Sequence, residues 1–489
     1  MAEPHIVGVA GDSGVGKTTI SKLIRLYYGD ENSVIISTDD LHKWERSNEI
    51  WKTTTHLNKV SNNLELGDIH LKELREGKSV YRSKYDHKTG YFKPPQKIHP
   101  KKNIIVEGLH AFYTEYSKQN IDLKIFIDTE KTLRKHWKIL RDTEERGHSY
   151  NEVLESIKRR ETDTNDITEK QITCSDVVIK LRSRNKIENV GSRNEKIDLS
   201  VTIENKSKKS VELFAFIKDF MNGLHSFFSV SETIGNNIEL VQGKGGNISI
   251  KTGDYVIIKP SGFRIKDLKN LNKISVIGLD DFELKDLLVT GNLLKPSLEF
   301  KFHTLFDKYV LHTHPVYLVL LLSLVNSELI LKDIYKNFDY DYIGYTEPGE
   351  KLYEKINNTK NIRNIVFLER HGLIVSSDSG KEAVNITLEI NGLAEKHLRK
   401  MHKNNFRSFG DFIKSDEGVW EKLALFTFPD SAVFLQGEKV GASCRETYLA
   451  QKYIIKYGSK IGELNALNEK EIRSLNSMES EKYRREGVS

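Results

Sequence analysis

Short apolar segments alternate with amphipathic segments along residues 1–180. The apolar segments are rich in β-branched residues and read HIVGVAG, SVIISTDD, NIIVEGLH, LKIFIDT and DVVIKL. The amphipathic segments have helical spacing, as in KTLRKHWKILRDTEER at residues 131–146. Strands that alternate with helices favour a parallel sheet covered by helices on both faces. The pattern therefore predicts an α/β domain in this part of the chain.

The alternation ends after Leu181, where the chain becomes polar and basic, with one strand-like run at Ile197–Ile203. A new helical pattern starts at VELFAFIKDFMNGLHSFF, and strands mixed with helices follow. We predict two α/β domains, at residues 1–205 and 212–489, joined by a linker at 206–211. The C-terminal stretch ELNALNEKEIRSLNSMESEKYRREGVS predicts a helix that docks on the second domain or packs between subunits.

The longest apolar run is VYLVLLLSLV, from Val316 to Val325. A membrane-spanning helix needs about 20 apolar residues, so this shorter run predicts a buried helix and no membrane partner. The first residues, MAEPHIVGVAGD, lack the charged and apolar regions of a signal peptide. We therefore expect a cytoplasmic protein.

Composition narrows the class of protein further. Of 489 residues, 38% are hydrophobic and 29% are charged, which is typical of a globular protein with real cores. The net charge of +6 is small, so we expect small anionic metabolites as partners and no nucleic acid. Cys174 and Cys444 form no CxxC pair, which fits a reducing compartment.

A phosphate-binding loop is predicted at GDSGVGKTT, which starts at Gly11. The stretch fits G-x-x-x-x-G-K-[ST] and lies between a predicted strand and a predicted helix. Its backbone N–H groups can surround phosphates, Lys17 can neutralise their charge, and the Thr18 hydroxyl can bind Mg²⁺. We expect ATP and Mg²⁺ as cofactors. The expected nucleotide-binding residues are Gly11, Ser13, Gly14, Gly16, Lys17, Thr18 and Thr19.

Phosphoryl transfer also needs a base for the acceptor hydroxyl and a carboxylate beside the metal. Asp39 and Asp40 end one predicted strand, and Glu107 ends another. One of the two aspartates can instead cap the following helix. The residues alone leave this choice open.

Five segments of the first half together resemble the phosphoribulokinase and uridine kinase family: GDSGVGKTT, STDDLHKWER, YDHKTG, VEGLHAFY and HWKILRDTEERGHS. The resemblance implies that Asp39 is the general base, Glu107 is the metal-side carboxylate, and His42 and Arg46 hold the acceptor. It also implies a basic segment that contacts ATP phosphates and the acceptor, formed by Lys138, Arg141, Asp142 and Arg146. A solvated helix face is the alternative for this segment. A sugar or sugar phosphate is the expected acceptor, with a nucleoside as the alternative.

Histidines raise a second possibility in the later half of the chain. In LHTHP, His312 and His314 lie on the same face of a predicted strand, and His371 ends another strand in LERHGLIV. Three neutral imidazoles with an open position are typical of a catalytic zinc site, although histidines at strand ends are often structural. Glu299 begins a predicted helix, where it serves as an acid/base or only complements the helix dipole.

Turns in the same half can present N–H and hydroxyl groups to an anion. The segments GGNIS, KPSG, PSLEFKFH, HTHP and RHGLIV together resemble the class II aldolase and adducin family across about residues 211–489. The resemblance implies zinc at His312, His314 and His371, an acid/base at Glu299, and a homo-oligomer. It places the substrate phosphate at Asn247, Ser261, Gly262 and Ser297. Leu298 occupies a position where the family often has a second serine.

The two halves predict a bifunctional enzyme of carbohydrate metabolism. An ATP-dependent kinase would be fused to a zinc-dependent lyase, whose metal would polarise a ketose while Glu299 moves a proton. The alternatives are a nucleoside kinase for the first half, and a sugar-phosphate epimerase or a non-catalytic adducin-like scaffold for the second. A nucleic-acid-binding protein with a phosphate loop is disfavoured, because no basic patch with interleaved aromatic residues stands out.

Overall fold

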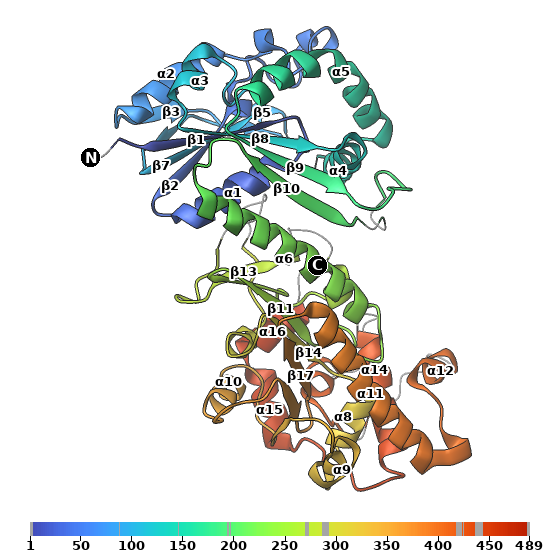
Figure 1. Cartoon of the computed structure of the whole chain (residues 1–489). Helices are drawn as coiled ribbons and strands as arrows, with labels where there is room; N and C mark the ends of the chain where they lie inside the picture. Colours follow the sequence, from blue (N-terminus) through green and yellow to red (C-terminus); the bar gives the residue numbers. More distant parts are fainter. Residues whose placement is uncertain are drawn as a thin grey trace. The chain divides into compact units, whose positions relative to one another are not determined.

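The chain forms two compact units, Met1–Asn222 and Gly223–Ser489 (Figure 1). The division falls inside helix α6 (Val211–Gly235), which follows the predicted linker at residues 206–211. This computed structural model describes residues 3–87, 89–144, 146–192, 195, 197–268, 273–285, 293–416, 423, 425–435 and 444–486.

The first unit is built on a six-stranded sheet with the strand order β10-β9-β8-β1-β7-β2. All neighbours are parallel except β10, which runs antiparallel to β9 at the edge. The parallel α/β fold predicted for this part is therefore confirmed, and the run at Ile197–Ile203 falls mostly in β10. The strands are β1 (His5–Gly11), β2 (Ser33–Ser37), β7 (Asn103–Gly108), β8 (Leu123–Thr129), β9 (Val177–Ser183) and β10 (Leu199–Asn205).

Helices cover both faces of this sheet, with α2 and α3 on one side and α1 on the other (Figure 1). Leu71 and Leu74 of α2 pack in one core cluster with Ile6 and Ile104 of the central strands. Burial of such apolar surface is the main stabilising force for the unit. The helices are α1 (Lys17–Tyr28), α2 (Leu64–Arg75), α3 (Glu115–Asn120), α4 (Lys131–Glu144) and α5 (Tyr150–Thr173).

Short elements lie between β2 and β7 in the sequence, and they carry ring side chains to the carboxyl edge of the sheet. β3 pairs with β6 and β4 with β5, each in a small antiparallel ladder. The elements are η1 (Thr38–Leu41), η2 (Glu49–Lys52), η3 (Lys59–Ser61), β3 (Val80–Arg82), β4 (Tyr85–Asp86), β5 (Tyr91–Phe92) and β6 (Gln96–Ile98).

The second unit contains a seven-stranded sheet with the order β13-β12-β11-β14-β17-β16-β15. Its pairs are antiparallel except β15 and β16. The register places Asn247 opposite His312, and His312 opposite Ile374, so residues distant in sequence meet at one sheet edge. The strands are β11 (Asn247–Thr252), β12 (Tyr255–Ile258), β13 (Ser275–Gly278), β14 (Tyr309–Thr313), β15 (Asp341–Ile343), β16 (Ile365–Leu368) and β17 (Gly372–Ser377).

Helices surround this second sheet. Every side chain of α8 is buried, which confirms the buried helix predicted from the apolar run. Among the described residues, no helix is both long and apolar enough to cross a bilayer. The helices after α6 are α7 (Phe300–His303), α8 (Val316–Leu322), α9 (Ser327–Ile334), α10 (Glu350–Asn357), α11 (Gly380–His402), α12 (Phe409–Lys414), α13 (Pro429–Phe434), α14 (Arg445–Gly458), α15 (Glu469–Ser477) and α16 (Glu479–Glu486), with short turns η4 (Ile265–Asp267) and η6 (Lys403–Asn405).

The predicted C-terminal helix is two helices, α15 and α16, separated at Met478. They dock on the second unit, where Leu475 packs with Ala432 and Val433 of α13. α15 begins with a capping box between Asn468 and Glu471, a local signal that fixes its first turn.

Candidate active sites

The phosphate loop joins β1 to the first turn of α1, as the motif predicts. Gly16 precedes the helix with a φ of 94°, and the Nζ atom of Lys17 donates to the carbonyl of Asp12 at 2.8 Å. Burial lowers the pKa of Lys17, although Asp39 and Glu107 face it. The loop thus holds a buried amine next to two acids and directly before a helix N-terminus, the arrangement that binds phosphates.

Gly14 brings this loop close to α4. Its φ is 84°, and a Cβ atom there would lie 3.0 Å from the Cβ atom of Lys138. A side chain at this position would therefore push the basic segment away from the loop.

Glu107 is the second-last residue of β7 and lies opposite Val9 of β1 and Ser37 of β2. The Thr18 hydroxyl donates to Glu107 Oε1 at 3.4 Å. Burial raises the pKa of Glu107. A hydroxyl and a carboxylate that meet in this way are the ligands that Mg²⁺ takes beside phosphates.

The structure separates the two adjacent aspartates. Asp40 accepts the backbone N–H of Tyr85 at 2.9 Å, so it ties η1 to β4. Asp39 instead lies with Oδ2 3.6 Å from His87 Nε2. Burial alone would raise the pKa of Asp39, but His87 and Lys17 outweigh it and hold the pKa well below its usual range. Of the two aspartates, Asp39 is therefore the one whose lowered pKa favours the charged form, while burial raises the pKa of Asp40.

Aromatic rings surround the predicted acceptor residue His42. Its ring centroid lies 4.5 Å from that of His56 and 5.1 Å from that of Tyr85. The Trp51 ring lies 3.8 Å from that of His56, tilted by 35°. Arg46 donates a hydrogen bond to the backbone carbonyl of His87. His87 belongs to the YDHKTG segment and contacts Asp39, the predicted base, although no role was predicted for His87 itself.

The basic segment on and after α4 gathers around Asp142. The carboxylate accepts from Lys138 Nζ at 2.7 Å and from Arg141 Nε at 2.8 Å, and Arg146 Nη1 lies 3.5 Å away. Arg141 also donates to the Ser13 hydroxyl of the phosphate loop at 3.3 Å. Lys138 is only 5% exposed, which excludes a merely solvated face for that residue.

The three histidines of the second unit converge. Their candidate ligand nitrogens lie within 4.8 Å of one another, and the Nε2 atoms of His312 and His314 are 3.2 Å apart. Nitrogens bound to one zinc ion at about 2.0–2.1 Å would have a similar separation. Burial lowers the pKa of His371 to about 3, so its imidazole is neutral and can act as a ligand.

Neighbouring groups orient these rings. His312 Nδ1 donates to the carbonyl of Leu373 at 3.1 Å, which leaves its Nε2 lone pair exposed to the centre. Asp430 Oδ2 lies 3.2 Å from Nδ1 of His314 and has the same effect on that ring. Three converging imidazoles, two of them with a partner at Nδ1, next to a carboxylate, fit a divalent metal ion.

Glu299 faces the histidines. Its Oε2 lies 3.5 Å from His312 Nε2, and its Oε1 lies 3.5 Å from His371 Nε2. Asn247 donates to Oε2 at 2.8 Å. Burial raises the pKa of Glu299 to about 8. The carboxyl therefore has the position and the proton affinity of an acid/base group.

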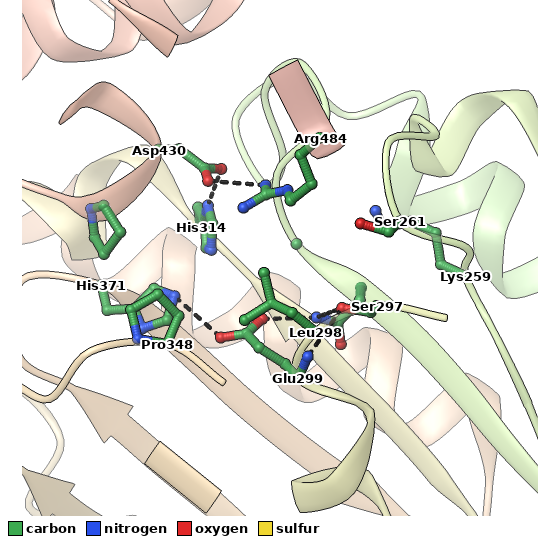
Figure 2. A pocket seen from close by; sticks show the side chains of 13 residues that line it. Lys259, Ser261, Ser297, Leu298, Glu299, His314, Pro348, His371, Asp430 and Arg484 are labelled. Atoms are coloured by element: carbon green, nitrogen blue, oxygen red, sulfur yellow. Dashed lines mark hydrogen bonds and ion pairs between the residues drawn. The ribbon is translucent and has the colours of Figure 1, made fainter. Parts of the chain in front are cut away.

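A pocket joins these residues to the predicted phosphate site (Figure 2). Asn247, Ser261 and Ser297 line it together with Glu299 and His371, and Gly262 follows in the turn with a φ of 82°. Leu298 also lines the pocket, where a hydroxyl was expected from the family pattern.

Three charged residues of this pocket were not predicted: Lys259, Asp430 and Arg484. Burial lowers the pKa of Lys259 to about 7, and its Nζ donates to the carbonyl of Phe263 at 3.0 Å. Lys259 lies in the KPSG segment, two residues before Ser261, and this spacing could have predicted that Lys259 belongs to the same site. Asp430 and Arg484 lie in segments that are 54 residues apart, and no role was predicted for either residue.

The comparisons with known proteins agree with this division. Residues 6–188 match the model of the phosphoribulokinase / uridine kinase family, and residues 230–398 match that of the class II aldolase and adducin N-terminal domain. A phosphoribulokinase of Synechocystis sp. is 36% identical over 188 residues, which cover 38% of this chain and 57% of that protein. A uridine kinase of Brevibacillus brevis is 34% identical over 157 residues, which cover 32% of this chain and 73% of that protein.

Among solved structures, the N-terminal class II aldolase domain of a conserved protein from Thermoplasma acidophilum is 24% identical, with a TM-score of 0.32, and covers 36% of this chain and 93% of that chain. The chain spans 48% to 57% of the length of the curated phosphoribulokinases that it matches. Residues 6–188 belong to the phosphoribulokinase and uridine kinase family, and residues 230–398 match the model of the class II aldolase and adducin N-terminal domain.

Proposed function

We propose that the chain is a bifunctional enzyme of carbohydrate metabolism. Its first unit would transfer a phosphoryl group from ATP to a hydroxyl of a sugar or sugar phosphate. Its second unit would be a zinc-dependent lyase that breaks or forms a carbon–carbon bond in a phosphorylated sugar. The observation that carries the proposal is the meeting of Glu299 with three converging imidazoles in a pocket that also holds hydroxyl and amine groups.

In the kinase half, Asp39 is the proposed base, because Lys17 and His87 keep its carboxylate charged. Asp40 is the weaker candidate, because its carboxylate already accepts the backbone N–H of Tyr85. Lys17 and the loop N–H groups would hold the ATP phosphates, and Thr18 and Glu107 would hold Mg²⁺. Arg141 would neutralise the transferred group from its place beside Ser13.

A phosphorylated or phosphorylatable sugar is the favoured acceptor, because Arg46 binds the carbonyl of His87 and Arg146 lies near Asp39, the proposed base. Guanidinium groups bind phosphate in a bidentate way. A nucleoside is the second candidate, since aromatic side chains, Trp51 and Tyr85 among them, gather near His42 and could contact a base.

In the lyase half, His312, His314 and His371 would hold the zinc ion. When bound, zinc supplies a Lewis acid that polarises carbonyl and hydroxyl oxygens. Glu299 would take and return the proton at the reacting carbon or oxygen, and Asn247 fixes the orientation of its carboxyl group. Ser261, Gly262 and Ser297 would bind the substrate phosphate, and this remote binding would fix the reacting end.

The second reaction class is epimerisation of a sugar phosphate, which uses the same metal and acid/base groups. A scaffold without activity is disfavoured by the buried and oriented histidines. Incubation of the purified chain with candidate ketose phosphates, followed by NMR of the products, separates cleavage from inversion. Glu299→Gln is the control for this assay, and wild-type turnover in that variant would contradict the proposed chemistry.

For the kinase half, the test is a screen of pentoses, pentuloses, their phosphates and uridine for ATP consumption. A sugar or sugar phosphate that consumes ATP in the wild type and not in Asp39→Asn supports the proposal. Consumption with uridine alone would favour the nucleoside reading. Because the two units are fused, we propose that the product of the kinase reaction is the substrate of the lyase. A kinase product that the second unit does not convert would contradict this coupling. A cytoplasmic location and a homo-oligomer belong to the same proposal.

A further inference from the structure

Two ion pairs link the histidine centre to the last part of the chain, beyond the segment that matches the aldolase family. That segment ends at residue 398, whereas Asp430, Glu471 and Arg484 all follow it. Asp430 contacts the ligand His314, and Arg484 contacts Asp430. Glu471 contacts Arg370, the residue before His371. The surroundings of the proposed metal site therefore include groups that lie beyond the residues matched by the family model.

The first ion pair holds the backbone at His371. Arg370 precedes this histidine and has a φ of 51°, a left-handed conformation that disfavours side chains. Its guanidinium binds Glu471 of α15 in a bidentate manner, at 3.0 and 2.9 Å, and donates to the carbonyl of Ala466 at 3.1 Å. It also stacks over the Tyr345 ring at 4.1 Å. α15 thus secures the turn from which His371 projects.

The second ion pair holds the ring of His314. Asp430 contacts His314 Nδ1 with one oxygen and accepts from Arg484 Nη2 with the other, at 2.9 Å (Figure 2). Glu481 binds the same guanidinium at 2.7 and 2.9 Å, so α16 presents Arg484 in a fixed orientation. Asp430 is 3% exposed, and water cannot readily substitute for either partner.

We propose that α15 and α16 form a clamp on the metal site, in which Glu471 positions His371 through Arg370, and Arg484 positions His314 through Asp430. The proposal rests on the metal site of the proposed function. A carboxylate on the second nitrogen of a ligating histidine fixes its tautomer and increases its basicity, and loss of such a partner typically costs 10- to 100-fold in metal affinity. The proposed role of these four side chains is to position the histidine ligands.

The test is the affinity of the metal-stripped full chain for zinc alone, measured by competition with a chelating dye. We expect Asp430→Asn and Arg484→Gln to raise the zinc Kd by about 10- to 100-fold. Glu471→Gln acts through one more residue, and we expect a rise of severalfold. Arg484→Lys keeps the charge on Asp430 and should restore part of the affinity.

The matched control is Glu469→Gln, which removes the exposed pair between Glu469 and Arg473 on the same helix, α15. It should leave the zinc Kd unchanged. Thermal unfolding of each metal-free variant separates a clamp from a fold defect, because a merely structural role lowers the midpoint without a selective change in zinc Kd. A folded Asp430→Asn and a folded Glu471→Gln with wild-type zinc Kd would overturn the clamp alone. Absence of zinc binding by the wild type would overturn the proposed metal site as well.

Discussion

Asn247 holds the carboxylate of Glu299 through a hydrogen bond of 2.8 Å from its side-chain amide to Oε2. The orientation of that amide is itself fixed, because its oxygen accepts from His303 Nε2. His303 Nδ1 in turn accepts from the Ser249 hydroxyl at 2.7 Å. Burial lowers the pKa of His303 to about 3, so the ring stays neutral and keeps this single tautomer. The chain of contacts determines which face of Glu299 is open to a substrate.

Asn247→Asp tests this relationship with little change in shape. The new carboxylate still accepts from His303, but it offers no donor to Glu299. Above the Glu299 pKa of about 8 the carboxyl is ionised, and a hydrogen bond to a charged group contributes about 1.5–3 kcal/mol, so we expect the lyase kcat measured above pH 8 to fall by about 10- to 100-fold. Steady-state assays on the ketose phosphate found by the substrate screen measure the effect. The kinase activity of the same chain is the internal control, and a wild-type lyase kcat would contradict the role given to Asn247.

The adjacent aspartates of the first unit provide a matched pair. Asp39→Asn should lower the kinase kcat by about 10²- to 10⁴-fold, because the amide cannot take the acceptor proton. Asp40→Asn keeps an oxygen that can accept the Tyr85 N–H, so we expect a kcat close to that of the wild type. ATP consumption with the acceptor from the screen distinguishes them. Equal losses in both variants would show that the base is not Asp39.

The histidines and Glu299 should separate metal binding from turnover. His314→Ala removes one of three converging nitrogens, and we expect bound zinc to fall from about one per chain to a small fraction of that. Glu299→Gln should retain zinc and lose lyase turnover by about 10²- to 10⁴-fold. Mass spectrometry of the metal content measures the first effect and product formation the second. His397→Ala, which alters a histidine of α11 outside the pocket, should change neither.

Much of the fold was readable because its signals are local. The apolar run that became β1 spans the same residues, His5–Gly11, as the strand, and alternation of such runs with helices sufficed for a parallel sheet. The three histidines were also found, since each lies in a short motif at a strand end. The strand register places His312 opposite Asn247, and the spacing of apolar residues could not predict this pairing.

The remainder of the site depends on contacts between distant segments. Arg484 and Asp430 are 54 residues apart in the sequence, and no motif in either segment predicts that they come into contact. Lysines are mostly exposed, so the burial of Lys259 is a tertiary property that its sequence neighbours do not reveal. The choice between Asp39 and Asp40 was likewise decided by the position of Tyr85, which belongs to a hairpin 45 residues later.

Gly245 is tightly enclosed by the histidine centre, and its replacement should disturb both parts of it. A Cβ atom at this position would lie 2.3 Å from Asp430 Oδ2 and 2.9 Å from His314 Nδ1, so Gly245→Ala must displace one of the two groups. We expect a weaker zinc affinity and a loss of about 1–3 kcal/mol in unfolding free energy. Gly392→Ala is the control, because nothing lies within 4 Å of its Cβ position in α11, and alanine there should stabilise by up to about 1 kcal/mol. Denaturant unfolding and dye competition measure both quantities, and a Gly245→Ala variant that matches the wild type in each would mean that the pair formed by His314 and Asp430 moves without cost.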